Sequence, residues 1–188
     1  MQVIQQSFSH SSSSFMIGKI QGNIVDLLYA PLSAAEVTIA VSLASVTRAV
    51  MIAIISIITF MLIIEIQITN YLALIAFTFL SSFILGNVGI IAGLWSEKFD
   101  NMATVTNFVI IPLSFLSGTF YSIERLPGLL KTISEFNPFF YMIDGFRYSF
   151  IGQADGSITV GLVYLTILSV VSWFITYLLY KNGYKIKS

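Results

Sequence analysis

The sequence predicts an all-α, multi-pass membrane protein, a single membrane domain over residues 1–188 that crosses the bilayer four times. Charged residues make up only 10% of the chain and apolar residues 56%, whereas ordinary soluble domains are roughly 25% charged. The mean hydropathy is +0.89. Long uncharged runs also recur, and about 20 helical residues are enough to cross a hydrocarbon core of about 30 Å.

The residue inventory excludes several classes of function. Nine basic and nine acidic side chains cancel, so the charge does not indicate a nucleic-acid partner. The absence of cysteine and the single His10 exclude disulfides and a metal cluster. No phosphate-binding loop and no catalytic constellation is present, so we expect no enzyme activity and no cofactor in this chain. Met1–Phe8 lack the basic flank and apolar core of a cleavable signal peptide.

Four segments have the length of a membrane span. Residues 71–94, 102–123 and 157–180 contain no charged side chain. A fourth span, at about 45–64, contains Arg48. Because only 16 residues of this span follow the arginine, or about 24 Å of helix, we expect Arg48 about one turn inside the boundary, where its stem reaches the headgroups. An arginine at the centre of a span costs about 2.5–3.5 kcal/mol on insertion scales.

The distribution of basic residues predicts the orientation. With the tail 181–188 in the cytoplasm, six basic side chains lie inside and three outside, which satisfies the positive-inside rule. The inner six are Lys19, Arg48, Lys98, Lys181, Lys185 and Lys187, and the outer three are Arg125, Lys131 and Arg147. Because four spans is an even number, we expect the N-terminal stretch in the cytoplasm as well.

The segment 19–36 is too polar to span the bilayer. Apolar residues recur at helical spacing in its first half, and Pro31 with Ser33 is expected to end this helix and to cap the next. Two interpretations fit this pattern. The helix lies on the inner leaflet as an amphipathic surface element, or it is a docking element for a cytoplasmic partner.

The segment 124–156 is predicted to form two short amphipathic helices on the outer side, separated by Asn137 and Pro138. Asp144 and Arg147 are one turn apart, so we expect them to pair with each other or across a subunit interface, since a lone charge near hydrocarbon is costly. The many aromatic residues of this segment are typical of an interfacial belt, and contact with a substrate is the alternative.

Small residues and one proline mark the interiors of two spans. Ser82, Gly86, Gly89 and Gly93 recur three to four residues apart, and such faces let helices approach closely, here within one subunit. Pro112 is expected to kink its helix. The turn at 97–100 is expected to be a solvated loop. No acidic residue or histidine lies deep in a predicted span, which counts against a proton-coupled carrier, and we expect nothing polar and specific to line any span.

Three stretches carry a family resemblance over nearly the whole chain. Residues 21–36 read QGNIVDLLYAPLSAAE, residues 93–127 read GLWSEKFDNMATVTNFVIIPLSFLSGTFYSIERLP, and residues 137–147 read NPFFYMIDGFR. In this order, the chain resembles the membrane subunit of type-2 ATP-binding-cassette (ABC) exporters. This bacterial group includes permeases for polysaccharides, lipo-oligosaccharides and drugs.

The resemblance implies a six-span permease with a cytoplasmic coupling helix between spans two and three and two external helices before the last span. By position, the region that meets the ATPase would include Gly22, Asp26, Leu27, Leu28, Pro31 and Glu36. The signature of span five and of the external helices would include Pro112, Gly118, Phe120, Leu126, Pro127, Pro138, Tyr141, Asp144 and Arg147.

The resemblance also implies a function and partners. The chain would be the inner-membrane permease of an ATP-driven exporter of a lipid, oligosaccharide, polysaccharide or drug-like substrate. It would work as a homodimer or with a related permease, and a separate ABC ATPase subunit would carry ATP and magnesium. One departure stands out, because the sequence contains only the last four of the six spans. The alternatives are therefore a truncated remnant or assembly partner and, less favoured, an ion-coupled secondary carrier.

Overall fold

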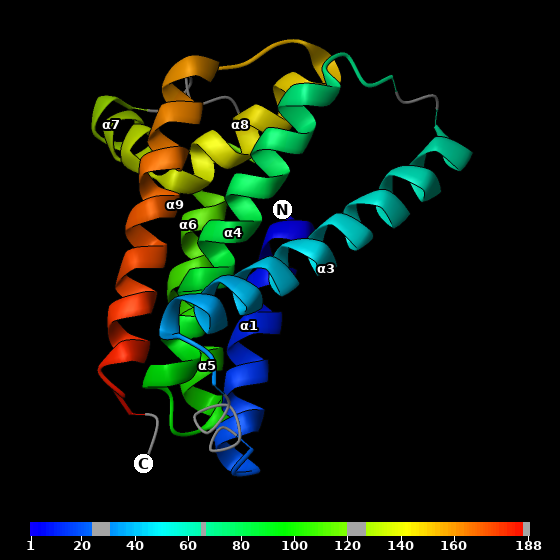
Figure 1. Ribbon diagram of the computed structural model, residues 1–188. Coiled ribbons are helices and arrows are strands. Elements are labelled where there is room, and N and C mark those ends of the chain that lie inside the picture. Colours follow the sequence, from blue (N-terminus) through cyan, green and yellow to red (C-terminus); the bar gives the residue numbers. More distant parts are fainter. Residues whose placement is uncertain (24–30, 65–66, 120–126, 186–188) are drawn as a thin grey trace.

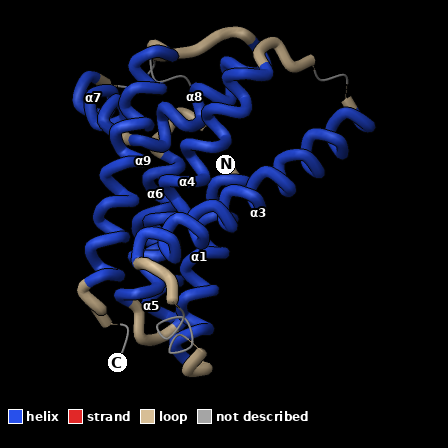
Figure 2. The backbone as a smooth tube through the Cα atoms, in the orientation of Figure 1, coloured by secondary structure: helices blue, strands red, loops and turns tan. Residues whose placement is uncertain are grey.

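The computed structural model describes residues 1–23, 31–64, 67–119 and 127–185, and this part of the chain is helical without strands (Figure 2). The helices, in chain order, are α1 (Gln2–Ile20), α3 (Ala34–Ile63), α4 (Tyr71–Trp95), α5 (Phe99–Val105), the π-helix η1 (Thr106–Ile110), α6 (Ile111–Phe115), α7 (Gly128–Phe136), α8 (Pro138–Ile151) and α9 (Ile158–Lys181).

Helix α4 is the central helix, because α1, α3, α8 and α9 all pack against it. Figure 1 shows α1, α4 and α9 standing roughly upright, while α3 crosses them at an incline so that its second half leaves the bundle. Helices α7 and α8 cover one end of the bundle. The C-terminus and α5 lie at the opposite end.

Among the described residues, three helices are long and apolar enough to cross a membrane, namely α3, α4 and α9. The bounds of α4 and α9 agree with the predicted spans 71–94 and 157–180 to within one residue at each end. On the outer faces of α3 and α9, large side chains such as Ile55 and Ile167 remain about 60% exposed, at 61% and 60%. Such surfaces are stable against lipid and unfavourable in water.

The predicted span 102–123 corresponds to a rod made of three consecutive helical segments, α5, η1 and α6. It begins at Phe99, ends at Phe115 and contains the π-helical turn η1, which ends two residues before Pro112. Proline lacks an N–H, and the widened turn lets Ile111 donate its N–H to the carbonyl of Thr106. A π-helical turn thus precedes Pro112, and the kink expected at this proline stays a prediction. The crossing of the membrane by this rod, and with it the count of four spans, stays a prediction.

Helix α3 begins well before the predicted span, because Ser33 and Glu36 form a capping box. The Ser33 hydroxyl accepts from the Glu36 N–H, and the Glu36 carboxylate accepts from the Ser33 N–H. The predicted cap at Ser33 is confirmed. Since nothing interrupts the helix after this cap, Arg48 is the fifteenth of its 30 residues. The helix thus extends well beyond the predicted span 45–64, and the position of Arg48 about one turn inside the membrane boundary stays a prediction.

Helix α1 is the main difference from the sequence prediction. The even number of predicted spans places the N-terminal stretch in the cytoplasm, and the structure has a 19-residue helix in this stretch that packs into the bundle, with the N-terminus at mid-height (Figure 1). The side of the membrane on which this stretch begins stays a prediction. The face of α1 toward the bundle contains Ile4, Phe8 and Phe15, at most 5% exposed. Buried serines, Ser7, Ser11 and Ser12, lie among them. A hydropathy average over the whole helix hides this apolar face.

The close approach of α1 to α4 depends on glycine. A Cβ atom added to Gly89 would lie 2.5 Å from the carbonyl oxygen of Phe8, and one added to Gly93 would lie 2.9 Å from the carbonyl oxygen of Ser12. Gly86 faces the Ser45 side chain of α3 in the same way. The predicted small-residue packing within one subunit is confirmed, and its partners are α1 and α3.

We predict that Gly89→Ala destabilises the protein although alanine is the better helix former. Alanine normally gains about 1 kcal/mol over glycine inside a helix, but its methyl group would push the α1 backbone away, at a cost of about 1–3 kcal/mol for overpacking. The measurement is thermal unfolding in detergent. Gly18→Ala is the matched control, since nothing lies within 4 Å of a Cβ there. Equal stability of the two variants would contradict the tight contact.

Candidate functional site

The residues assigned to ATPase coupling lie in the connection between α1 and α3. Gly22 follows the end of α1 with a φ of +74°, in the left-handed region that favours glycine. Pro31 is exposed just before α3. The other coupling residues of this connection, Asp26, Leu27 and Leu28, lie outside the described residues.

Glu36 has a structural role of its own. Its Oε2 atom lies 2.7 Å from the Ser33 nitrogen and 2.8 Å from the Ser33 Oγ atom. The carboxylate is therefore engaged in starting α3. A substitution that removes this acceptor damages the helix start as well as any contact with a partner, so coupling by Glu36 stays a prediction.

The end of α1 is fixed to the end of α4 by Lys19. Its Nζ donates to the carbonyl oxygens of Leu94 and Ser96, both at 3.0 Å. These carbonyls have no partner within the helix, and the negative end of the helix dipole favours a cation there. Burial lowers the pKa of Lys19, and the charge of Lys185 adds to this effect while Glu97 opposes it.

The turn after α4 is tied to the C-terminal tail. Lys185 Nζ donates to Glu97 Oε1 at 3.0 Å and lies 6.0 Å from the centre of the Trp95 ring. The hydrogen bond from Lys185 lowers the pKa of Glu97. The sequence predicts a solvated loop here. The structure adds that this turn joins α1, α4 and the tail in one polar cluster.

Asn87 is a buried polar junction in the middle of the bundle. Its Oδ1 accepts from the Ser42 hydroxyl of α3 at 3.0 Å, and its Nδ2 donates to the carbonyl of Phe83 at 2.8 Å. Its own carbonyl accepts from the Thr176 hydroxyl of α9 at 3.4 Å. The expectation that nothing polar and specific lines a span is wrong. The asparagine inside the uncharged run 71–94 was the signal that could have indicated this junction.

Asp144 and Arg147 hold α8 against two other segments. Asp144 is only 3% exposed, and its carboxylate accepts from the N–H groups of Asp155 and Gly156 at 2.8 and 2.9 Å. Arg147 binds Asp155 Oδ2 at 2.6 Å and the Gly118 carbonyl at 2.7 Å. Burial raises the pKa of Asp144, and the two N–H donors and then Arg147 oppose the rise.

The predicted ion pair of Asp144 and Arg147 is present, but Arg147 lies closer to Asp155 than to Asp144. Their charged atoms are 3.8 Å apart, against 2.6 Å between Arg147 and Asp155. The difference arises because Asp144 turns toward the backbone before α9, where two N–H groups converge on it. The structure thus brings the signature residues Gly118, Asp144 and Arg147 together, and it adds Asp155, which the sequence did not indicate.

The other signature residues have mainly packing roles. Pro138 is the first residue of α8, preceded by Asn137, whose side chain caps the helix, so the predicted break between two helices is confirmed. The Tyr141 ring lies 5.1 Å from that of Tyr164. Pro127 precedes α7, and Phe120 and Leu126 lie outside the described residues. Not all aromatic residues of this segment are placed for an interfacial belt, because Phe139 and Phe140 are buried, each 4% exposed.

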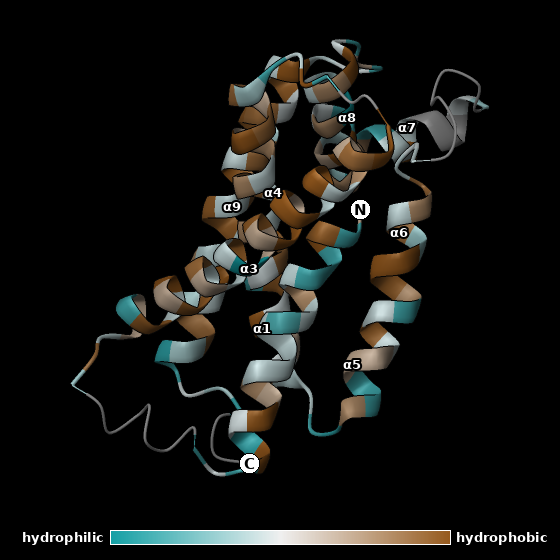
Figure 3. Ribbon diagram, turned by 90° about the vertical axis from the view of Figure 1, so that its right-hand side faces the viewer, coloured by the Kyte–Doolittle hydropathy of each residue, from teal (hydrophilic) through white to brown (hydrophobic). Residues whose placement is uncertain are grey.

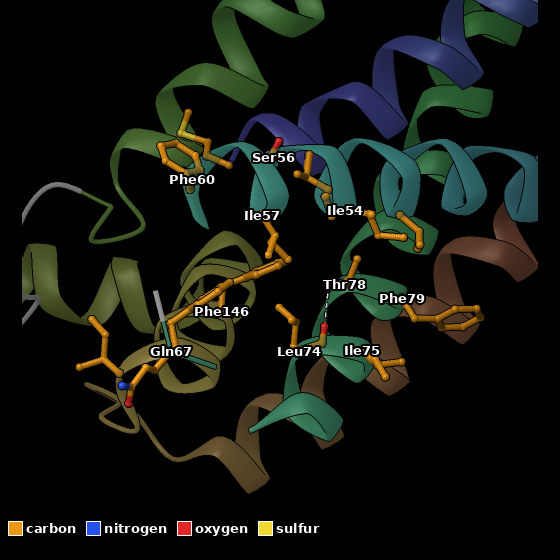
Figure 4. A pocket seen from close by; sticks show the side chains of 16 residues that line it. Ile54, Ser56, Ile57, Phe60, Gln67, Leu74, Ile75, Thr78, Phe79 and Phe146 are labelled. Atoms are coloured by element: carbon orange, nitrogen blue, oxygen red, sulfur yellow. Dashed lines mark hydrogen bonds between the residues drawn. The ribbon is translucent and has the colours of Figure 1, made fainter. Parts of the chain in front are cut away.

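A cavity of about 860 Å³ lies between the inclined half of α3 and the helices α4 and α8. Figure 4 shows side chains of α3, such as Ile57 and Phe60, opposite Leu74 and Phe146. Met1 and Val3 of α1 also line it. The Thr78 hydroxyl in its wall already donates to the carbonyl of Leu74 at 2.6 Å. The cavity is suited to an apolar chain and not to a polar headgroup.

Comparison with known proteins decides the family. Residues 1–151 match the family described as ABC-2 type transporter. The chain belongs to that family. This ABC-2 chain is also 29% identical over 188 residues to the inner membrane transport permease YadH of Escherichia coli K12, and the similarity covers the whole chain and 73% of the relative. The YadH permease of Shigella flexneri gives the same figures.

A shorter similarity extends to Nodulation protein J of Rhizobium leguminosarum bv. viciae, 26% identical over 90 residues, 48% of this chain and 35% of the relative. No solved structure matches the chain significantly. Membership in the ABC-2 family, together with the apolar helices, makes this chain a transport permease of the membrane.

We predict that Arg147 couples more strongly to Asp155 than to Asp144. In double-mutant cycles with Arg147→Gln, Asp155→Asn should show a coupling energy of about 1 kcal/mol, as for a partly exposed ion pair with a direct hydrogen bond. Asp144→Asn should show less, because its carboxylate is held by backbone donors. Thermal unfolding in detergent provides the energies, and the reverse order would restore the pair expected from the sequence.

Proposed function

We propose that this ABC-2 chain is the permease subunit of an ATP-driven exporter. The observation that carries the proposal is the polar cluster at the end of α1 and α4. Lys19 is the last charged residue before the connection 21–33 and binds the carbonyls of Leu94 and Ser96 directly. A displacement of the end of α1 would therefore also displace the end of the central helix α4.

The motor belongs to a separate subunit. The sequence has no phosphate-binding loop, so an ABC ATPase would hold ATP and magnesium and dock on the coupling region around Asp26. Closure of two ATPase subunits would push this region. The tight contact of α1 with α4 then makes these two helices move together, and the junction at Asn87 includes α3 and α9 in the movement.

The pathway would form between two permease subunits, as a homodimer or with a related chain. The apolar cavity beside α3 supports a substrate that has an apolar part, within the range of lipids, lipo-oligosaccharides and drug-like molecules. An ion-coupled carrier is less favoured, since among the described residues no acidic side chain lies inside α4 or α9.

The orientation we propose has the lysine-rich end in the cytoplasm. Lys19, Lys98 and Lys185 gather at the end of the bundle where α5 and the C-terminus lie (Figure 1). Arg147 belongs to α8 at the opposite end. This asymmetry satisfies the positive-inside rule.

The first test concerns ATPase docking. Asp26→Lys should reduce co-purification with the ABC ATPase subunit by severalfold, because it reverses a charge in the coupling region, while membrane insertion stays unchanged. Glu135→Lys is the matched charge reversal, on an exposed residue of α7 at the other end of the bundle. Glu36→Gln adds a further arm, since glutamine keeps the capping box and removes only the charge. Unchanged association in Asp26→Lys would contradict docking at this region.

The second test concerns sidedness. A reporter enzyme that is active only outside the cytoplasm should stay inactive when fused after Ser188 and should be active when inserted within residues 128–131. The lysine distribution supports this expectation. Activity of the C-terminal fusion would reverse the proposed orientation, whatever the outcome for ATPase docking.

A further inference from the structure

The outward face of α1 is a continuous polar strip. It consists of Gln2, Gln6, Ser9, His10 and Ser13, which recur at helical spacing on one face. None of these residues is buried, and Gln2 and Ser9 are exposed. Figure 3 shows teal and white segments along α1, with brown ones between them. The strip is thus an exposed polar surface on a protein whose helices α3 and α9 expose large apolar side chains.

The strip lies at the depth of the spans and not at their end. Phe8 and Ser12 of α1 contact Gly89 and Gly93 of α4, inside the run that the sequence and the structure both give as a span. His10 is nine residues before Lys19, or about 14 Å along the helix. A surface at this depth that faced lipid would be strongly unfavourable.

Arg48 of α3 completes this surface. It is exposed at the middle of its helix, and its Nη1 atom lies 3.1 Å from Nδ1 of His10. A guanidinium only donates, so Nδ1 accepts and the neutral ring bears its hydrogen on Nε2. The pair therefore presents only donors outward. Within the described part of the chain, no carboxylate forms an ion pair with Arg48.

The same side of α3 continues with apolar residues. Met51, Ile55 and Ile58 follow Arg48 at spacings of three to four residues, and they are 63%, 61% and 54% exposed. A positive charge thus stands at the head of an apolar stripe two to three turns long. This order of charge and apolar surface is complementary to a molecule with an anionic head and a hydrocarbon chain.

We propose that the polar strip lines the translocation pathway and that Arg48, with His10, binds the phosphate or carboxylate group of a transported anionic amphiphile. The guanidinium forms charge-assisted hydrogen bonds to the anion, Nε2–H of His10 adds a neutral donor, and the stripe from Met51 to Ile58 contacts the chain. The inference rests on the proposed export function and names the chemical class of its substrate.

The first experiment tests whether the strip faces water. Because the natural chain has no cysteine, Ser13→Cys introduces a single thiol into the permease, purified with its ATPase in phosphatidylcholine nanodiscs. A quaternary-ammonium methanethiosulfonate reagent should label it readily. Ile167→Cys, on a 60% exposed apolar position of α9, is the control and should resist labelling. Equally slow labelling of both variants would overturn the proposal.

The second experiment tests the anion site in the Ser13→Cys protein. Dihexanoyl phosphatidic acid should protect the thiol, whereas dihexanoyl phosphatidylcholine, with the same chains, and inorganic phosphate should not. Adding Arg48→Gln should raise the concentration needed for protection about tenfold or more, as for loss of a charge-assisted hydrogen bond. Arg48→Lys should restore part of the protection, and Lys181→Gln, the same charge change at the end of α9, should have no effect.

Each outcome of this experiment decides a separate point. Unchanged protection in Arg48→Gln would refute the anion site, and equal protection by inorganic phosphate would refute the amphiphile. Protection that ATP fails to release, in a complex that hydrolyses ATP, would identify a resident lipid and overturn the proposal. Failure of the ATPase to co-purify would instead contradict the exporter function, and the labelling of Ser13→Cys would still report whether the strip faces water.

Discussion

The close contact of α1 with α4 is the interaction on which the rest of the structure depends. Gly89 and Gly93 allow the α1 backbone to approach α4 so closely that no side chain fits between them. Without apolar desolvation to drive association in lipid, such backbone proximity is what gives helices enough van der Waals contact to stay together. Helix α4 is also hydrogen-bonded to α3 and α9 through Asn87, and its Phe77 packs against Gly145 of α8. The position of α1 is therefore coupled to that of the whole bundle.

Polar groups secure this bundle at three levels. Lys19, Glu97 and Lys185 form a cluster at one end, Asn87 joins three helices in the middle, and Asp144, Arg147 and Asp155 fix α8 at the other end. Each interhelical hydrogen bond contributes only about 0.6–2 kcal/mol. Together they restrict how the helices move relative to one another, which a permease requires if force applied at one end is to open the other.

Helix α3 separates two surfaces of opposite character. The apolar cavity lies on its side toward α4 and α8, whereas Arg48 meets the polar strip of α1. Its inclined second half leaves the bundle (Figure 1). A helix that starts at the region where we propose that the ATPase docks, and that borders both surfaces along its length, is well placed to change their accessibility when it moves. The capping box at Ser33 and Glu36 makes that start well defined.

The sequence by itself determined the features that depend on local composition. Uncharged runs identified α4 and α9, Ser33 and Asn137 marked helix starts, glycine spacing indicated close packing, and three motifs in order indicated the ABC-2 family. Only the tertiary structure decided where polar residues find partners. It packed the serine-rich α1 against the bundle, placed Arg48 beside His10, and paired Arg147 with Asp155. Hydropathy sums over neighbours in sequence, whereas a buried polar group is satisfied by groups far away along the chain, which no local pattern specifies.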